Sequence, residues 1–123
     1  MPAPIEQQIT FLYVRDLNAS AAFYAGILRL PLARDQGPCR IFRTAPNAYL
    51  GICQREDVSP APQGLIVTLV TDDVEGWYAL ALAAGAHVEG PPAHNDHYRI
   101  THCFLRDPDG YCVELQRFDD RLD

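Results

Sequence analysis

The residue with the clearest chemical potential is Glu114, which follows the sequence Pro108-Asp109-Gly110 near the end of the chain. Pro-Asp-Gly between two β-prone segments predicts a tight hairpin, with Glu114 on the returning strand among apolar neighbours. A carboxylate in such surroundings is usually paired, hydrogen-bonded, bound to a metal or exposed in a cavity. Glu114 is therefore the first candidate for a general acid, a general base or a ligand-binding group.

Four histidines, at three places in the sequence, are the candidates to assist such chemistry. His102 lies on the strand expected to precede the hairpin, where it either packs within the sheet or serves as a polar contact or acid–base partner near Glu114. His94 and His97 lie in a Pro-rich segment, and this spacing there is more typical of a solvated loop than of a metal site. His87 is expected in a short, partly exposed strand.

No second catalytic motif is present in the sequence. A Gly-rich phosphate-binding loop and a Gly-x-Ser-x-Gly nucleophile motif are both absent. The four cysteines lack Cys-x-x-Cys spacing and lie in apolar, strand-like segments, which predicts four reduced, buried thiols rather than disulfides or a zinc site. These cysteines are Cys39, Cys53, Cys103 and Cys112.

The composition is that of one globular domain. Of the 123 residues, 48% are hydrophobic and 21% are charged, which allows one substantial core but not two independent ones. The net charge of −6 and the ten scattered Lys and Arg residues exclude nucleic acid as an expected partner. Without a long apolar run or a signal-peptide pattern, the sequence predicts no membrane association and a cytoplasmic location.

The elements that position Glu114 follow one pattern twice. A β-prone segment is followed by a segment with helical spacing of apolar residues, namely Leu17, Ala21, Tyr24 and Leu28 in the first half and Trp77, Leu80, Ala81 and Ala84 in the second. Three further β-prone segments follow each helix. The expected strands are Thr10–Val14, about 31–35, 39–44 and 48–54, then Leu65–Thr71, about 86–89, 98–106 and 111–117.

This repeat divides the chain into two βαβββ modules. Module one covers about residues 8–57 and module two about residues 65–118, and the Pro-rich stretch at about 58–64 suits a linker between them. The second helix is expected to begin with a capping box at Asp72 and to end at Gly85. One face of each sheet is covered by its own helix, and the other face needs a partner.

Two motifs in this order resemble the vicinal oxygen chelate superfamily, which includes glyoxalase I, bleomycin resistance proteins, fosfomycin resistance enzymes and extradiol dioxygenases. They are Val14-Arg15-Asp16-Leu17, followed by Ser20 and Phe23-Tyr24, and the closing hairpin Leu105–Leu115. The resemblance spans nearly the whole chain. It implies a single α+β domain over residues 1–123, in which two βαβββ modules form a cleft-containing, partly closed β-sheet barrel. It also implies a homodimer.

The resemblance also implies where a metal would be held. In the metalloenzymes of this superfamily, ligands come from the first and last strands of each module. The matching positions here are Ile9, Gly51, Leu65 and Glu114. Only Glu114 can bind a cation, and a catalytic divalent metal needs about three protein ligands. We therefore expect no metal site and no cofactor.

Strand alternation predicts which residues line the cleft. Ile9, Phe11 and Tyr13 share one face of their strand, Cys112 shares the face of Glu114, and the result is an apolar and aromatic lining with a few polar groups. The same residues could instead fill an ordinary core. The predicted ligand-binding residues are Phe11, Tyr13, Tyr49, Gly51, Cys53, Leu65, His102, Cys112 and Glu114.

The favoured functional hypothesis is metal-independent binding of a small apolar or aromatic molecule in the inter-module cleft, as in the bleomycin resistance proteins that the chain resembles. Catalysis is the alternative. It would be either a glyoxalase-like metal-dependent lyase or dioxygenase whose ligands are misaligned, or a metal-free enzyme with Glu114 as its catalytic acid or base. A regulatory or structural dimer with a filled core is a third hypothesis.

Overall fold

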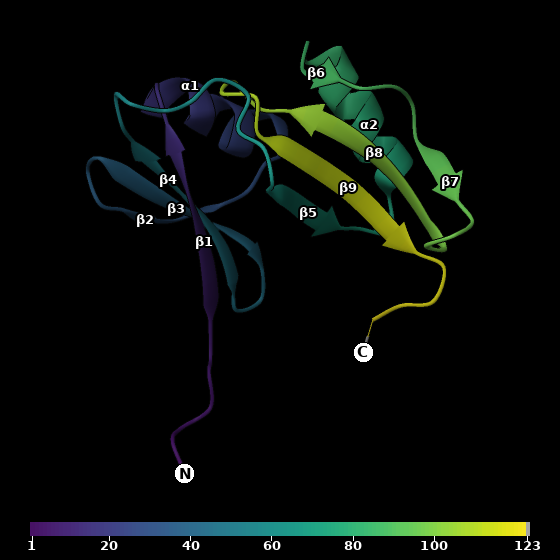
Figure 1. The fold of residues 1–123 in the computed structure, drawn as a ribbon, viewed down its shortest axis with the longest axis horizontal. Coiled ribbons are helices and arrows are strands. Elements are labelled where there is room, and N and C mark those ends of the chain that lie inside the picture. The colour runs from purple at the N-terminus through teal and green to yellow at the C-terminus, as the bar shows by residue number, and fades with distance from the viewer. Residues whose placement is uncertain (123) are drawn as a thin grey trace. The chain divides into compact units, whose positions relative to one another are not determined.

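The computed structural model describes residues 1–122, and the chain forms two compact units. The first unit covers Met1–Val58, and the second begins at Ser59. Each unit contains one β-sheet with its own helical segment (Figure 1). The predicted α+β class is confirmed, and each unit follows the predicted order of a strand, a helical segment and further strands, with one strand more than predicted in the second unit.

The sheet of the first unit has four strands in the order β1-β4-β3-β2, with β1 parallel to β4. Its side chains alternate as predicted, since Leu12 and Val14 are buried on the helix-covered face while Ile9, Phe11 and Tyr13 are 40–52% exposed on the other, open face. The elements are β1 (Gln8–Val14), α1 (Leu17–Ala21), η1 (Ala22–Ile27), β2 (Leu32–Asp35), β3 (Cys39–Ala45) and β4 (Ala48–Gln54).

The helical segment of the first unit begins at an aspartate cap. The Asp16 carboxylate accepts hydrogen bonds from the backbone N–H groups of Asn18 and Ala19, which have no partner inside the helix. After α1 the chain continues as the π-helix η1, which the sequence pattern does not predict. The four apolar residues that define the helical spacing are nevertheless all buried, as expected for the side that packs on the sheet.

The sheet of the second unit follows the order β5-β9-β8-β6, with β5 parallel to β9, and β7 also pairs with β8. Strand β7 is not predicted from the sequence, which places residues 94–97 in a solvated loop. It forms because Ala93 and Asn95 lie opposite His102 and Ile100 of the long strand β8. The elements are β5 (Ile66–Val70), α2 (Val74–Ala83), β6 (His87–Val88), β7 (Ala93–Asn95), β8 (Ile100–Arg106) and β9 (Cys112–Phe118).

The ends of helix α2 are set by local hydrogen bonds. Its N-cap is Asp73, one residue later than predicted, and the Asp73 carboxylate accepts from Gly76 N while Glu75 pairs with Arg117 of β9 at 2.8 Å. The predicted stop at Gly85 is confirmed. Gly85 has φ +80°, and the N–H groups of Gly85 and Ala86 donate to two carbonyls of the last turn.

The β8–β9 hairpin is confirmed and is held by Asp107. This buried carboxylate accepts from Asp109 N at 3.0 Å and from Tyr111 N at 2.8 Å, and Gly110 N donates to Asp107 O. Gly110 has φ +91°, and a Cβ there would overlap Ala61. The turn therefore fixes where β9 begins, and with it the position of Glu114.

Within residues 1–122, no helix has the length and apolar character needed to cross a membrane.

The prediction of four free thiols is wrong for one pair. Cys39 of β3 and Cys53 of β4 lie directly opposite each other and form a disulfide. The other two cysteines, Cys103 and Cys112, are free and buried. Burial raises the pKa of the Cys103 thiol to about 11 and also raises the pKa of the Cys112 thiol. Both are therefore protonated at neutral pH and are poor nucleophiles.

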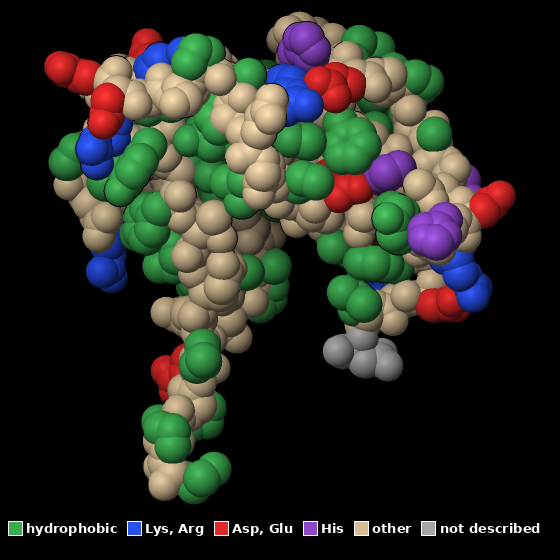
Figure 2. Space-filling view, in the orientation of Figure 1, with side chains coloured by type: hydrophobic (Ala, Val, Ile, Leu, Met, Phe, Trp, Pro, Cys, Tyr) green, Lys and Arg blue, Asp and Glu red, His purple; other side chains and the backbone are tan. Residues whose placement is uncertain are grey.

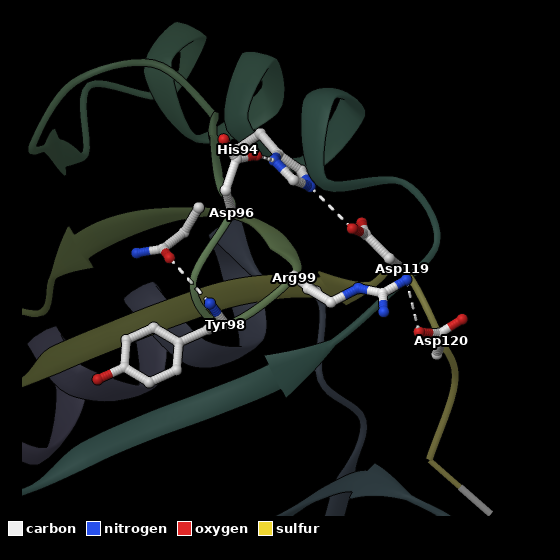
Figure 3. Close-up of polar contacts among 7 residues, drawn as sticks. His94, Asp96, Tyr98, Arg99, Asp119 and Asp120 are labelled. Atoms are coloured by element: carbon white, nitrogen blue, oxygen red, sulfur yellow. Dashed lines mark hydrogen bonds and ion pairs between the residues drawn. The ribbon is translucent and has the colours of Figure 1, made fainter.

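His94 holds the C-terminal segment against β7 (Figure 3). Its Nδ1 lies 2.8 Å from Asp96 Oδ1, and its Nε2 lies 2.9 Å from Asp119 Oδ2. The contact with Asp119, followed by that with Asp96, raises the pKa of His94. Beside it, Arg99 forms an ion pair with Asp120 at 2.9 Å. His94 thus has a structural role rather than the metal-binding role that its spacing with His97 could suggest.

We expect the pairing of His94 to make stability fall as the pH rises. Because its pKa is higher in the folded state, the contribution is complete below about pH 6.5, the value for an unfolded chain, and is lost as the pH passes the raised folded value. Urea unfolding of the parent and of His94→Gln across this range measures the effect. The difference in unfolding free energy between them should shrink with rising pH. A constant difference would contradict the pairing.

Candidate functional site

The carboxylate of Glu114 lies at the centre of a hydrogen-bonded cluster on β9. Oε1 accepts from the Thr68 hydroxyl at 2.7 Å, and Oε2 lies 2.5 Å from His102 Nδ1 and 3.1 Å from Gln116 Nε2. Glu114 is only 7% exposed. Three donors thus replace the hydration that this buried carboxylate loses, which explains how an ionisable group is tolerated among apolar neighbours.

The sheet register brings these side chains together. Thr68 of β5 and Phe104 of β8 lie directly opposite Glu114 on either side, and His102 of β8 lies opposite Gln116. All of them lie on the open face of the second sheet, whereas Val113 and Leu115 of β9 are buried on the face that contacts α2. The hairpin turn and the parallel β5–β9 pairing therefore build the cluster.

The surroundings of the cluster are largely apolar. Ile66 and Val70 of β5 are 56% and 61% exposed beside it, and the rings of His102 and Phe104 meet edge to face with centroids 5.0 Å apart. Figure 2 shows hydrophobic side chains on the visible face of the second unit, with a histidine and an acidic group among them. Apolar side chains with a few fixed polar groups among them are also the usual lining of small-molecule sites.

His102 presents the reactive atom of the cluster. Its Nδ1 faces the acceptor Oε2 of Glu114, so in the neutral ring the hydrogen belongs on Nδ1 and the lone pair on Nε2. Among residues 1–122, Nε2 of His102 has no hydrogen-bond partner, and the side chain is 19% exposed. The pair can therefore accept a hydrogen bond or a proton from a molecule that lies on the open face.

The family follows from comparison with known sequences. The sequence model of the Glyoxalase/Bleomycin resistance protein/Dioxygenase superfamily matches residues 7–115, which include both modules and Glu114. The chain belongs to this superfamily. No curated protein sequence matches the chain.

Solved structures show the same superfamily fold. A glyoxalase/bleomycin resistance protein/dioxygenase from Nocardioides is 18% identical, with 100% of this chain and 92% of that chain covered and a TM-score of 0.74. The fosfomycin resistance protein FosX from Listeria monocytogenes is 17% identical, with 95% and 94% covered and a TM-score of 0.72. A glyoxalase-related enzyme from Fulvimarina pelagi is 18% identical, with 92% and 88% covered and a TM-score of 0.76.

The residues of this superfamily member do not fit the metal that the resemblance implies. Ile9, Gly51 and Leu65 offer no donor atoms, and both oxygens of Glu114 already accept hydrogen bonds. Leu65 lies one residue before β5, and the β5 residue opposite Glu114 is Thr68. In the described part of the chain, no group of three or more His, Cys, Asp or Glu side chains is arranged to hold a metal ion.

The predicted ligand-binding residues of the first unit share the open face of its sheet. Phe11 lies opposite Gly51, and Tyr13 lies opposite Cys53, which is part of the disulfide. Gly51 leaves no free space on this face, because a Cβ at this position would overlap the Phe11 ring. Tyr49 lies further along β4, where its hydroxyl accepts from Gln7 Nε2 at 3.2 Å.

In the second unit, His102, Cys112 and Glu114 lie on one face of adjacent strands, and His102 contacts Glu114, whereas Cys112 lies further along the sheet, opposite Arg106. Two partners of Glu114 are absent from the sequence analysis, namely Thr68 and Gln116. Gln116 could have been found by alternation, since it is two residues from Glu114 on the same strand. Thr68 could not, because its place depends on the register of two strands far apart in the sequence.

Proposed function

We propose that this superfamily member binds a small, largely apolar or aromatic molecule on the open face of its second sheet, without a metal. The observation that carries the proposal is the hydrogen-bonded set around Glu114. Its oxygens are occupied by Thr68, His102 and Gln116, so the carboxylate serves to orient His102 rather than to hold a cation. The polar atom offered to a ligand is then His102 Nε2.

This geometry favours a ligand that is largely apolar and carries one hydrogen-bond donor. Neutral His102 accepts a hydrogen bond at Nε2 from a hydroxyl or amine group, and Phe104, Ile66 and Val70 supply the apolar contact area around it. A phenol-like molecule combines both properties. The exposed Thr68 side chain, whose hydroxyl is directed to Glu114, adds no competing charge.

A second candidate function is metal-free acid–base catalysis. The specific observation in its favour is the 2.5 Å contact between His102 and Glu114, since a carboxylate that fixes one imidazole nitrogen leaves the other to accept a proton. In this case Glu114 is a positioning residue, and His102 is the catalytic base. A bound molecule that is chemically changed by the parent but only bound by His102→Gln would identify the chain as an enzyme.

The test begins with thermal-shift screening of aromatic metabolites and antibiotics against protein treated with a chelator. A ligand at a hundredfold excess over its dissociation constant should stabilise the parent by about 2.7 kcal/mol. The stabilisation should fall strongly in His102→Leu, which removes the hydrogen-bond acceptor and keeps an apolar side chain. Glu75→Gln is the matched control, because it removes a polar contact of α2 and leaves the open face intact.

Two results would contradict the proposal. Equal stabilisation of the parent and of His102→Leu by every confirmed ligand would place binding away from this cluster. Binding that disappears after chelator treatment and returns with zinc, nickel, manganese or iron would show that a metal is required.

A further inference from the structure

A hollow lies on the first unit, far along the sequence from the Glu114 cluster and outside the proposed function. Its volume is about 250 Å³, and it opens beside strands β1 to β4 of the first sheet. Two of its lining side chains are arginines, and none is acidic. The lining residues are Gln7, Ile9, Ala33, Arg34, Ile41, Arg43 and Tyr49.

A β-bulge directs one arginine to this hollow. Leu32 pairs with Phe42 and Arg34 with Ile41, so Ala33 is an extra residue in β2 that has no partner of its own in β3. Such a bulge turns the following side chain relative to regular alternation. Without it, Arg34 would be directed to the opposite face of the sheet; with it, Arg34 lies beside Ile41 on the open face.

The second arginine is held over an aromatic ring. Arg43 and Tyr49 lie opposite each other on β3 and β4, and the Arg43 guanidinium lies 4.9 Å from the centre of the Tyr49 ring. The Tyr49 hydroxyl is fixed in turn by Gln7. Stacking leaves the edge of the guanidinium, which carries its N–H donors, free to bind an anion.

Neither arginine has a carboxylate partner in the described chain. Among residues 1–122, Arg34 and Arg43 form no ion pair, whereas Arg55, Arg99, Arg106 and Arg117 each pair with an acidic side chain. Two guanidinium groups without an acidic partner therefore line one hollow, in a chain with sixteen acidic residues and a net charge of −6. Ile9 and Ile41 contribute apolar side chains to the same lining.

We infer that this hollow binds a small aromatic carboxylate. The two guanidinium groups of Arg34 and Arg43 bind the carboxylate by charge-assisted hydrogen bonds, and the aromatic body lies against Ile9, Ile41 and Tyr49. A cationic ligand is disfavoured by the same two charges. The site therefore favours anionic ligands, whereas the negative net charge of the whole chain alone would attract cations.

The experiment titrates the full chain with 1-naphthoate and, as a matched neutral ligand, 1-naphthamide, with binding followed by NMR or calorimetry. Naphthoate should bind and naphthamide should bind at least tenfold more weakly. Arg34→Gln and Arg43→Gln should each weaken naphthoate binding about tenfold or more, because each removes charged hydrogen bonds. Raising the salt concentration should weaken naphthoate binding and leave naphthamide unchanged.

Arg40→Gln is the matched control, since Arg40 lies on β3 between Ile41 and Cys39 but donates to Asn18 on the helix-covered side. It should change naphthoate affinity less than twofold. Equal weakening by Arg40→Gln, or equal affinity for naphthoate and naphthamide, would overturn the inference. Glu114→Gln should leave naphthoate affinity unchanged, which separates this site from the function proposed for the second unit.

Discussion

Replacing Glu114 by alanine is expected to lower the free energy of unfolding by about 2–4 kcal/mol, because three donors lose their acceptor at once. His102 and Gln116 lie in largely buried surroundings, where water replaces the lost carboxylate poorly. Urea unfolding at neutral pH measures the change. Glu114→Gln should cost less, since its amide oxygen can still accept from one or two of the donors.

The matched control is Glu75→Ala, which removes an exposed carboxylate of α2 that pairs with Arg117. Its urea midpoint should lie close to that of the parent, because exposed ion pairs contribute little. If Glu114→Ala and Glu75→Ala unfold at the same urea concentration, the cluster does not stabilise the second unit. His102 would then be oriented by packing alone.

The fold could be predicted from the sequence because each local signal agrees with the tertiary structure. Alternation on β1, the spacing of Leu17, Ala21, Tyr24 and Leu28, and the Asp107–Gly110 turn all specify an element and its buried side. The π-helix and strand β7 could not be predicted in this way. Both depend on tertiary pairing or packing, as when β7 forms against the first residues of β8.

The candidate site could be predicted only in part. Alternation is enough to place Glu114, Cys112 and Phe11 on the open faces of their strands, but not to say what each one contacts. The hydrogen bond from Thr68 to Glu114 depends on the β5–β9 register. Arg34 lines its hollow because of a β-bulge that the residue types around it do not predict. Contacts between distant strands therefore decide the chemistry of both sites.

The disulfide could not be predicted from the sequence for the same reason. Cys39 and Cys53 both lie in strand-like segments, which favours the interpretation as buried thiols. Only the antiparallel register of β3 and β4 shows that they are direct neighbours across the sheet. The other two cysteines have no such partner, since Cys103 lies opposite Leu115 and Cys112 opposite Arg106.

Loss of this disulfide is expected to lower the free energy of unfolding by about 3 kcal/mol. The bond closes a loop with a sequence separation of 14 residues and restricts the unfolded chain. Thiol titration of freshly purified protein, in denaturant without reductant, should find only the two free thiols of Cys103 and Cys112. Addition of dithiothreitol should then reveal four thiols and shift the urea midpoint downwards.

Two variants distinguish the loss of the Cys39–Cys53 disulfide from other effects of dithiothreitol. Cys39→Ala combined with Cys53→Ala should unfold at the lowered midpoint and no longer respond to dithiothreitol, because no bond remains to be reduced. Cys103→Ala should keep its response, since this buried thiol is not part of the bond. Four free thiols in fresh protein would show that Cys39 and Cys53 lie side by side without bonding, and the reductant would then leave the midpoint unchanged.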